Sequence, residues 1–299
     1  MKIRVGYGLG VNSLTNDQER FGAFVDDLER LRFDSLWVSE RVAGQSPDPV
    51  VAMSYAAGRT RKLKFGMSVM VLPGRNPVLV AKSLASLDRL SNGRLLPAFG
   101  LGAPTLAEWA AFGIDRKDRA PWFDEALPLM RRLWTEEAVT HHGERFNFED
   151  LNVLPKPTQR PPDVWLGGQA ASELRRVGRL ADGWLPSFTL PAEVGTGIDK
   201  VKQVAAEHGR EIEEDHYGVL VAYRHGPLSD AYVAASRARR PELDPTEVIP
   251  EGFDALRQRL EQFTEVGASK FVLVPVAEPE TWTPELEAAA ELVARPLEN

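Results

Sequence analysis

The sequence predicts an α/β protein, a single (β/α)8 TIM barrel with insertions, forming one domain over residues 1–299. Short apolar segments alternate with segments of helical periodicity through most of the chain, which favours parallel βα units. About eight such units fit into 299 residues, a length close to that of a typical barrel. A doubly wound parallel sheet is the alternative fold. It normally carries a G-x-G-x-x-G motif after the first strand, whereas this chain has Gly6-Tyr7-Gly8-Leu9-Gly10 there.

The expected strands share a short apolar core and lie at residues 3–9, 35–38, 63–72, 95–100, 164–166, 183–185, 218–223 and 271–274. Thr15 and Gln18 have the spacing of a capping box, so the first helix is expected to begin there and to run to Leu31. Asn76-Pro77 combines a capping side chain with proline at the first helical position, and Asn92-Gly93 ends the same helix. Further helices are expected at residues 49–59, 120–134, 253–266 and 284–294.

Two segments depart from the alternation. Residues 139–148 read as a small hairpin with its turn at His142-Gly143-Glu144. Residues 224–250 have weak patterning and are expected to form an insertion that covers the pocket as a lid.

Composition excludes several classes of function. The chain has no cysteine, so disulfides, cysteine-ligated zinc and iron–sulfur clusters are impossible. The net charge of −7 without a basic tract argues against nucleic-acid binding. No apolar run is long enough for a membrane span, and the first residues lack the apolar core of a signal peptide, so we expect a cytoplasmic protein without a membrane partner.

The chemistry of a barrel lies at the carboxyl ends of its strands, and these ends are unusually poor in titratable groups here. None of the five histidines is expected at a strand's carboxyl end, so no metal site is predicted. No lysine ends a strand and no G-x-S-x-G motif is present. Strand ends lined by glycine and apolar residues favour a planar cofactor that brings its own reactivity.

Two loops fit such a cofactor. Residues 167–172 join a strand to a helix start, where backbone N–H groups and the helix dipole would hold a phosphate. Residues 66–73 place Ser68 inside an apolar strand. Each feature alone is also compatible with a purely structural role.

Four stretches of the chain carry a likeness to a known family: residues 28–40, 48–102, 123–134 and 161–184, of which the second contains FGMSVMVLPGRNPVLVAKSLASLDRLSNGRLLPAFGLG. Together they resemble the luciferase-like monooxygenase family, in particular its branch that depends on the deazaflavin coenzyme F420. The likeness fails mainly between residues 186 and 251. It implies a luciferase-like TIM barrel and a homodimer.

The resemblance also implies roles for individual residues. Ser68-Val69 matches a non-prolyl cis peptide that supports the cofactor ring, and Glu40 and Arg41 match residues near the reactive ring. The residues that match cofactor-binding positions are Ser68, Val69, Gly100, Leu101, Gly102, Gly167, Gly168, Gln169 and Ala170. The residues expected to line the substrate pocket are Tyr7, Met70 and Trp184. Arg75, Arg94 and Lys82 are candidates for contacts with the acidic cofactor tail.

The departures from the family pattern concern chemistry. Arg41 stands where many members have histidine, and Ala103 where some deazaflavin dehydrogenases have a catalytic glutamate. Leu101 replaces an arginine that contacts flavin phosphate in light-emitting members. An arginine at position 41 does not act as a base, but it stabilises negative charge, and we expect Glu40 to pair with it.

The sequence therefore predicts hydride transfer between F420 and an unknown small organic substrate. An FMN-dependent monooxygenase that uses O2, with reduced flavin supplied by a separate reductase, is the first alternative. A non-catalytic flavin-binding relative and a metal-dependent hydrolase on the same fold are further alternatives.

Overall fold

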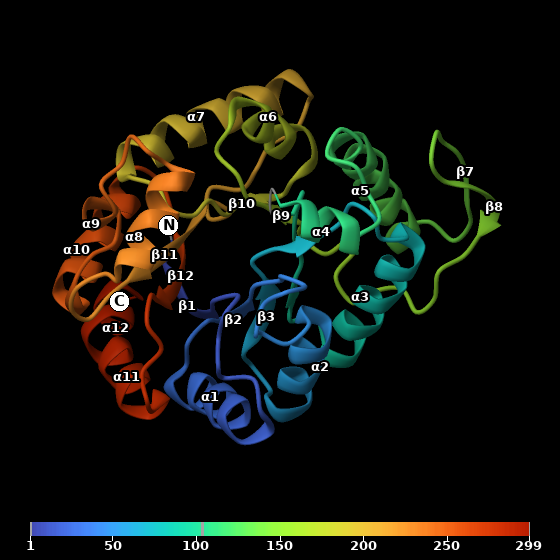
Figure 1. Cartoon of the computed structure of the whole chain (residues 1–299). Helices are drawn as coiled ribbons and strands as arrows, with labels where there is room; N and C mark the ends of the chain where they lie inside the picture. The colour runs from blue at the N-terminus through green and yellow to red at the C-terminus, as the bar shows by residue number, and fades with distance from the viewer. Residues whose placement is uncertain (1, 103–104, 299) are drawn as a thin grey trace.

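The computed structural model describes residues 2–102 and 105–298. Its parallel strands form a ring surrounded by helices (Figure 1). The strands are β1 (Arg4–Leu9), β2 (Ser35–Val38), β3 (Lys64–Met67), β4 (Met70–Val71), β5 (Leu95–Leu96), β6 (Ala98–Gly100), β9 (Trp165–Leu166), β10 (Gly183–Trp184), β11 (Gly218–Tyr223) and β12 (Lys270–Pro275). One sheet has the order β11-β12-β1-β2-β3-β5, and a second has the order β10-β9-β6-β4. Bridges from Trp184 to Tyr217 and from Ser187 to Leu220 join β10 to β11 and close the barrel.

The predicted third and fourth strands are each divided in two. β3 ends at Met67 and β4 begins at Met70, and the Ser68–Val69 peptide bond between them is cis. Pro97 separates β5 from β6, because proline has no N–H to donate to the ladder. The upper halves, β4 and β6, pair with each other in the second sheet. The third and fourth strands, which the sequence predicted as continuous, therefore each contribute their first half to one sheet and their second half to the other.

The outer layer consists of α1 (Gln18–Leu31), α2 (Pro49–Arg59), α3 (Pro77–Ser91), α5 (Arg119–Thr135), α6 (Ala171–Leu180), α7 (Pro191–Glu207), α10 (Gly252–Glu265) and α11 (Trp282–Ala289), which continues into the π-helix η1 (Ala290–Ala294) and α12 (Arg295–Glu298). The first cap differs from the prediction, because Asp17 rather than Thr15 accepts the N–H groups of Glu19 and Arg20, both at 2.9 Å. The caps of α3 are as predicted, with Asn76 at its start and Asn92 in the left-handed conformation at its end.

The hydrophobic core lies between the strands and these helices. Phe21, Phe24, Val25 and Leu28 of α1 are buried on one face, as their spacing predicted. Large aromatic residues fill the layer around the barrel, among them Trp37 and Trp134, whose exposed fraction is 0%. No helix among the described residues is long and apolar enough to cross a membrane.

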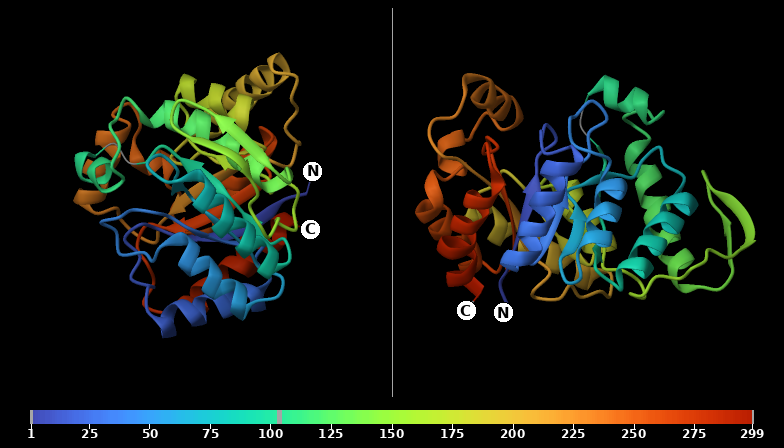
Figure 2. Two further views of the ribbon diagram at one scale, coloured as in Figure 1. Left: turned by 90° about the vertical axis from the view of Figure 1, so that its right-hand side faces the viewer. Right: turned by 90° about the horizontal axis from the view of Figure 1, so that it is seen from below.

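Insertions leave the barrel in two directions. The predicted hairpin is formed by β7 (Val139–His142) and β8 (Asn147–Leu151) and projects sideways from the barrel (Figures 1 and 2). The segment of residues 224–250 contains α8 (Asp230–Arg239) and α9 (Pro245–Val248). The helix α4 (Leu106–Ala111) was not predicted. In the right-hand view of Figure 2, α4 and α8 rise on the side of the barrel opposite the two chain ends.

Candidate functional site

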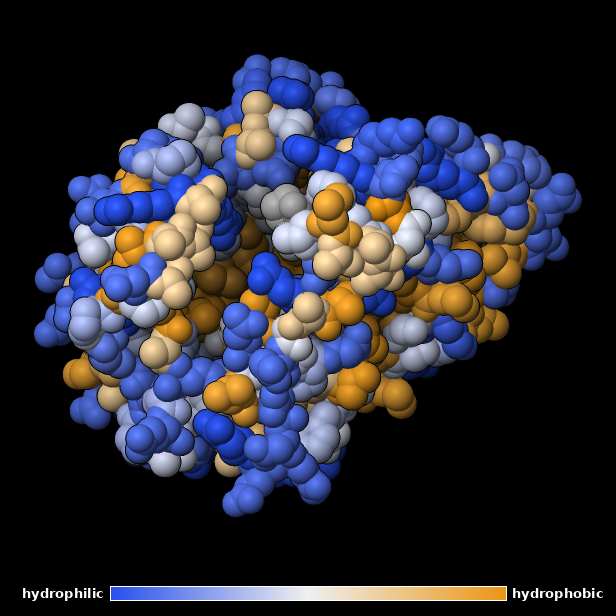
Figure 3. Space-filling model, viewed as in Figure 1, coloured by the Kyte–Doolittle hydropathy of each residue, from blue (hydrophilic) through white to orange (hydrophobic). Residues whose placement is uncertain are grey.

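Two adjoining cavities open at the carboxyl ends of the strands. The strand-three cavity, of about 350 Å³, is lined by Ser68 and Val69 beyond β3 and by the ends of β6 and β9. The strand-eight cavity, of about 560 Å³, is lined by Val274, Val276 and other residues at the ends of β1, β11 and β12. Val11, Ser187, Leu220 and Arg239 line both cavities, so the two spaces meet along a shared wall. Figure 3 shows a hollow on this face, with hydrophobic residues in its depth and both hydrophilic and hydrophobic residues at its rim.

The strand-three cavity brings together most of the residues that the sequence singled out. Those that line it are Glu40, Arg41, Ser68, Val69, Gly100, Leu101, Gly102, Gly167 and Gly168. They come from four successive strand ends, which the closed parallel barrel places side by side. Ala103, at the position of the family's glutamate, lies outside the described residues.

The segment at Ser68–Val69 forms one wall of this cavity. Ser68 N–H donates to Val38 O at 2.9 Å, and Ser39 Oγ–H donates to Ser68 O at 3.1 Å. Opposite, Gly100 leaves room for the Val69 side chain, since a Cβ on Gly100 would lie 2.5 Å from Val69 Cγ2. The end of β2 and the end of β6 therefore fix the position of this wall from both sides.

The loop after β9 is built differently from the predicted phosphate site. Gln169 and Ala170 donate their backbone N–H groups to Glu173 Oε2, at 2.8 Å and 2.9 Å. The helix start at α6 is therefore already capped by its own carboxylate. The prediction that these two N–H groups are available to an anion is wrong, and neither residue lines the cavity.

Gln169 has a structural role in this loop. Its side chain donates to Ser187 O at 2.7 Å and accepts from Arg240 Nη1 at 3.2 Å. Arg240 also pairs with Glu193 at 2.6 Å. These contacts tie the end of α8 to the barrel rim.

Glu40 is held by partners other than the expected one. Its carboxylate accepts Val71 N–H at 2.7 Å and pairs with Arg75 Nη2 at 2.5 Å. Arg75 Nε in turn donates to Val71 O at 2.9 Å. Burial raises the pKa of the Glu40 carboxyl above its usual value, and Arg75 offsets this only in part. The predicted Glu40–Arg41 pair does not form, because Arg75, 35 positions along the chain, takes that place.

Arg41 is exposed and lines the cavity. Two further cations in its lining, Arg176 and Arg239, were not predicted. Arg176 pairs with Asp124 at 2.7 Å, whereas Arg239 Nη2 donates to Ser187 Oγ at 3.1 Å. A local concentration of arginine favours an anionic ligand in spite of the net charge of −7.

The three residues predicted for the substrate pocket lie elsewhere. Tyr7 is fully buried between the sheet and helices α1 and α11, where its ring meets Trp282 edge-on at 5.9 Å. Met70 faces a separate cavity beside Leu79 and Leu84 of α3. The ring of Trp184 packs on Gly197 of α7. Successive side chains of a strand point to opposite faces, and these three point toward the helices rather than into the barrel.

The other basic residues proposed for the cofactor tail also have structural partners. Arg94 donates to Thr60 Oγ1 at 2.7 Å and to Leu63 O at 2.9 Å. Lys82 contacts Leu154 O, and Arg75 is paired with Glu40. None of the three lines the strand-three cavity.

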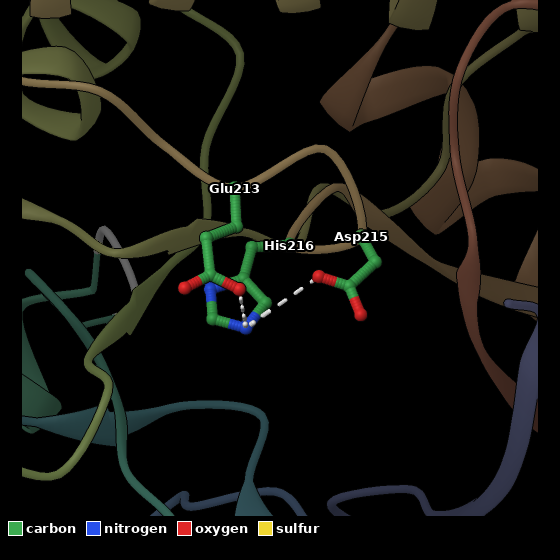
Figure 4. Close-up of side chains that lie close together, drawn as sticks. All are labelled: Glu213, Asp215 and His216. Atoms are coloured by element: carbon green, nitrogen blue, oxygen red, sulfur yellow. Dashed lines mark ion pairs between the residues drawn. The ribbon is translucent and has the colours of Figure 1, made fainter. Parts of the chain in front are cut away.

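The described residues contain one group of potential metal ligands, formed by Glu213, Asp215 and His216 (Figure 4). It lies just before β11, at the amino end of the barrel and away from both cavities. His216 Nε2 is 3.9 Å from Glu213 Oε2, and Asp215 pairs with Arg4 at 2.7 Å. His225 lies close to the carboxyl end of β11, contrary to the prediction for the histidines, but it pairs with Glu285 at 3.0 Å and lines neither cavity.

Comparisons with known proteins agree with this architecture. The family profile described as luciferase-like monooxygenase matches residues 3–291. The chain is 29% identical over 172 residues to an F420-dependent glucose-6-phosphate dehydrogenase of Kineococcus radiotolerans, covering 54% of this chain and 50% of that protein. It is 32% identical over 228 residues to limonene 1,2-monooxygenase of Rhodococcus erythropolis, covering 68% of this chain and 58% of that protein. The matches thus span little more than half the length of these relatives.

Solved structures show the same fold. An F420-dependent secondary alcohol dehydrogenase in complex with an F420-acetone adduct superposes with a TM-score of 0.79 at 22% identity and covers 100% of both chains. The oxygenating constituent of 3,6-diketocamphane monooxygenase from Pseudomonas putida, in complex with FMN, gives a TM-score of 0.77 at 16% identity and covers 99% of both chains. With an eight-stranded parallel barrel and a family match over almost its whole length, this chain belongs to the luciferase-like monooxygenase family.

Proposed function

We propose that this protein is an oxidoreductase that transfers a hydride between coenzyme F420 and a small organic substrate. The observation that carries the proposal is the lining of the strand-three cavity, which combines glycine walls with three arginines. Among the described residues its carboxylates are already engaged, Glu40 by Arg75 and Glu173 by the start of α6. Such a lining supplies position and charge rather than acid–base groups, which suits a cofactor with its own reactivity.

The residues present fit a planar anionic cofactor. The cavity volume of about 350 Å³ lies within the usual range for ligand pockets. A side chain at Gly100 or Gly167 would crowd the cavity wall. A Cβ on Gly100 would lie 2.5 Å from Val69 Cγ2, and a Cβ on Gly167 would lie 3.3 Å from Leu185 O. Ser68, Val69, Gly100 and Gly167 would hold the ring, and Arg41, Arg176 and Arg239 would hold its negative charges.

When bound, F420 supplies a hydride donor or acceptor. The chain's own residues orient the partners and exclude water. Arg41 stabilises negative charge at the open side of the cavity, and the Glu40–Arg75 pair fixes Val71 beside it. The strand-eight cavity adjoins this space and provides room for a substrate.

A second candidate function is a monooxygenase, because the chain is 32% identical to limonene 1,2-monooxygenase over 228 residues. FMN is its candidate cofactor, because a monooxygenase of the same fold was solved in complex with FMN. This alternative adds a separate reductase as partner. Two further proposals come from the sequence, a homodimer and a non-catalytic flavin-binding role. Sedimentation of the purified protein tests the homodimer. Turnover of the bound cofactor with any reductant would exclude the non-catalytic role.

Titration of the purified protein with F420 and with FMN, followed by cofactor fluorescence, separates the two main candidates. We expect saturable binding of F420 that is tighter than that of FMN. Tight FMN binding without F420 binding would overturn the proposal in favour of the monooxygenase. Binding of neither cofactor would refute both.

A further inference from the structure

The strand-eight cavity has mostly apolar walls. Val221 of β11, Phe263 of α10 and Trp282 of α11 contribute to them, together with Val248 from the inserted segment. Arg239 and Glu278 are the two charged residues among those that line it. Arg239 belongs to the wall shared with the strand-three cavity, whereas Glu278 lines the strand-eight cavity alone.

Glu278 is held in a defined orientation three positions after β12. Its Oε2 accepts the backbone N–H of Leu14 at 3.1 Å and the hydroxyl of Thr15 at 3.2 Å. The Thr15 hydroxyl oxygen in turn accepts Trp282 Nε1–H at 2.6 Å. One carboxylate oxygen is therefore fully used by the protein.

The other oxygen, Oε1, is buried, and none of the described residues donates a hydrogen bond to it. A buried charged acceptor without a donor is costly, because it has lost its water without gaining a partner. Glu278 lines the cavity, so a ligand there would reach Oε1 once the carboxylate turns toward it, and would then supply the missing donor.

We propose that the strand-eight cavity binds a largely apolar molecule with a hydrogen-bond donor, a hydroxyl or an ammonium group, which Glu278 Oε1 accepts. Identification of this molecule as the substrate rests on the redox function proposed above. Because Glu278 does not line the strand-three cavity, the donor lies at the end of the molecule remote from its reacting carbon.

Isothermal titration of the cofactor-free protein with three eight-carbon probes tests this inference. The probes are 1-octanol, octylamine and heptyl methyl ether, the last of which is an isomer of octanol that lacks a donor. We expect octanol or octylamine to bind the wild-type protein about 10- to 100-fold more tightly than the ether, the range for a hydrogen bond to a charged acceptor. The tighter of the two donors identifies the headgroup. Equal or tighter binding of the ether would overturn the proposal.

The variant Glu278→Gln sharpens the test. Leu14 and Thr15 must still donate to an oxygen, so the amide oxygen takes the place of Oε2 and the amide NH2 faces the cavity. We expect the preference for octanol over the ether to fall to within about twofold. The exposed Glu280→Gln, two positions away, is the matched control and should keep the wild-type preference.

An unchanged preference in Glu278→Gln would refute the role of this residue. The comparison of probes on the wild-type protein remains decisive if the variant does not fold. Because these measurements need no cofactor, they are independent of the F420 and FMN titrations. Failure of the proposed redox function leaves their outcome unaffected.

Discussion

Replacement of Gly100 by alanine tests whether the wall at Val69 borders the cofactor. The new Cβ would lie 2.5 Å from Val69 Cγ2, whereas ordinary van der Waals contact begins at about 3.4 Å, so Val69 must move by about 0.9 Å. Val69 lines the strand-three cavity, and movement into that space relieves the contact. The variant is therefore expected to fold, with a narrower cavity.

A bound ring that needs this space would oppose the movement. Overpacking of this kind costs about 1–3 kcal/mol, which corresponds to a loss of cofactor affinity of about 5- to 150-fold. The assay is the fluorescence titration of the variant with F420 and FMN, beside its thermal unfolding without cofactor.

The control is Gly58→Ala, because Gly58 is exposed on α2 and a Cβ added there would meet no other atom within 4 Å. This control should bind cofactor as the wild type does and gain about 0.4–1 kcal/mol in stability. Wild-type affinity of Gly100→Ala for both cofactors would show that no ring lies against Val69.

Four further predictions concern charge. Glu40→Gln should change the free energy of unfolding by less than about 1 kcal/mol, because loss of the charge pairing with Arg75 is offset by relief from burying a carboxylate whose exposed fraction is 7% and whose pKa is raised by that burial; a loss above about 3 kcal/mol in urea denaturation would contradict this. Lys270→Met should cost about 3 kcal/mol in urea denaturation, the lower end of the range for a broken buried ion pair, since Asp34 loses the ammonium group at 2.8 Å but keeps Lys64 at 3.7 Å and the Ser35 hydroxyl; a loss below about 1 kcal/mol would contradict it. Although burial opposes ionisation of Asp34, Lys270 holds the pKa of that carboxyl below its usual value. The stabilisation of the fold by ionised Asp34 is therefore present above the pKa of the unfolded state and is lost as the pH falls through the pKa of the folded state. Acid titration should show a steeper loss of folding stability in the wild type than in Lys270→Met. Arg239→Met should weaken cofactor binding about tenfold and reduce its salt dependence, whereas the exposed Arg237→Met should not; equal effects of the two variants would exclude a specific contact.

The sequence predicted the barrel and most of the strand-three cavity, for identifiable reasons. Strand ends of a parallel barrel meet at one rim, so locating the ends of the strands was enough to bring Ser68, Gly100 and Gly167 together. The resemblance added the cis peptide at Ser68–Val69, which the structure contains. Whether these residues bind a cofactor stays a prediction.

The errors have physical causes as well. Tyr7, Met70 and Trp184 were assigned to the pocket by their place along the chain, but the face of a strand alternates with every residue and decides their direction. The sequence alone could have predicted the cap by Glu173, because a glutamate three positions after the N-cap residue, here Ala170, commonly accepts the N–H groups at a helix start.

Other contacts were beyond local reasoning. Arg239 lines the cavities from a segment that Arg240 ties to Gln169 and Glu193, and it bonds to Ser187 itself. Arg75 meets Glu40 through the packing of β4 on its neighbours. Such pairings between distant positions depend on the assembled fold and leave no periodic pattern in the chain.

The wall shared by the two cavities constrains how this protein can diversify. Arg239 stands on an inserted segment that the barrel tolerates without disruption of its strands, so its surroundings are open to sequence change. Yet any exchange at this position alters both cavities at once. If the proposed function holds, new substrate preferences should therefore arise more readily at Val248 or Val276, which border the strand-eight cavity alone, than at the arginine that lines both cavities.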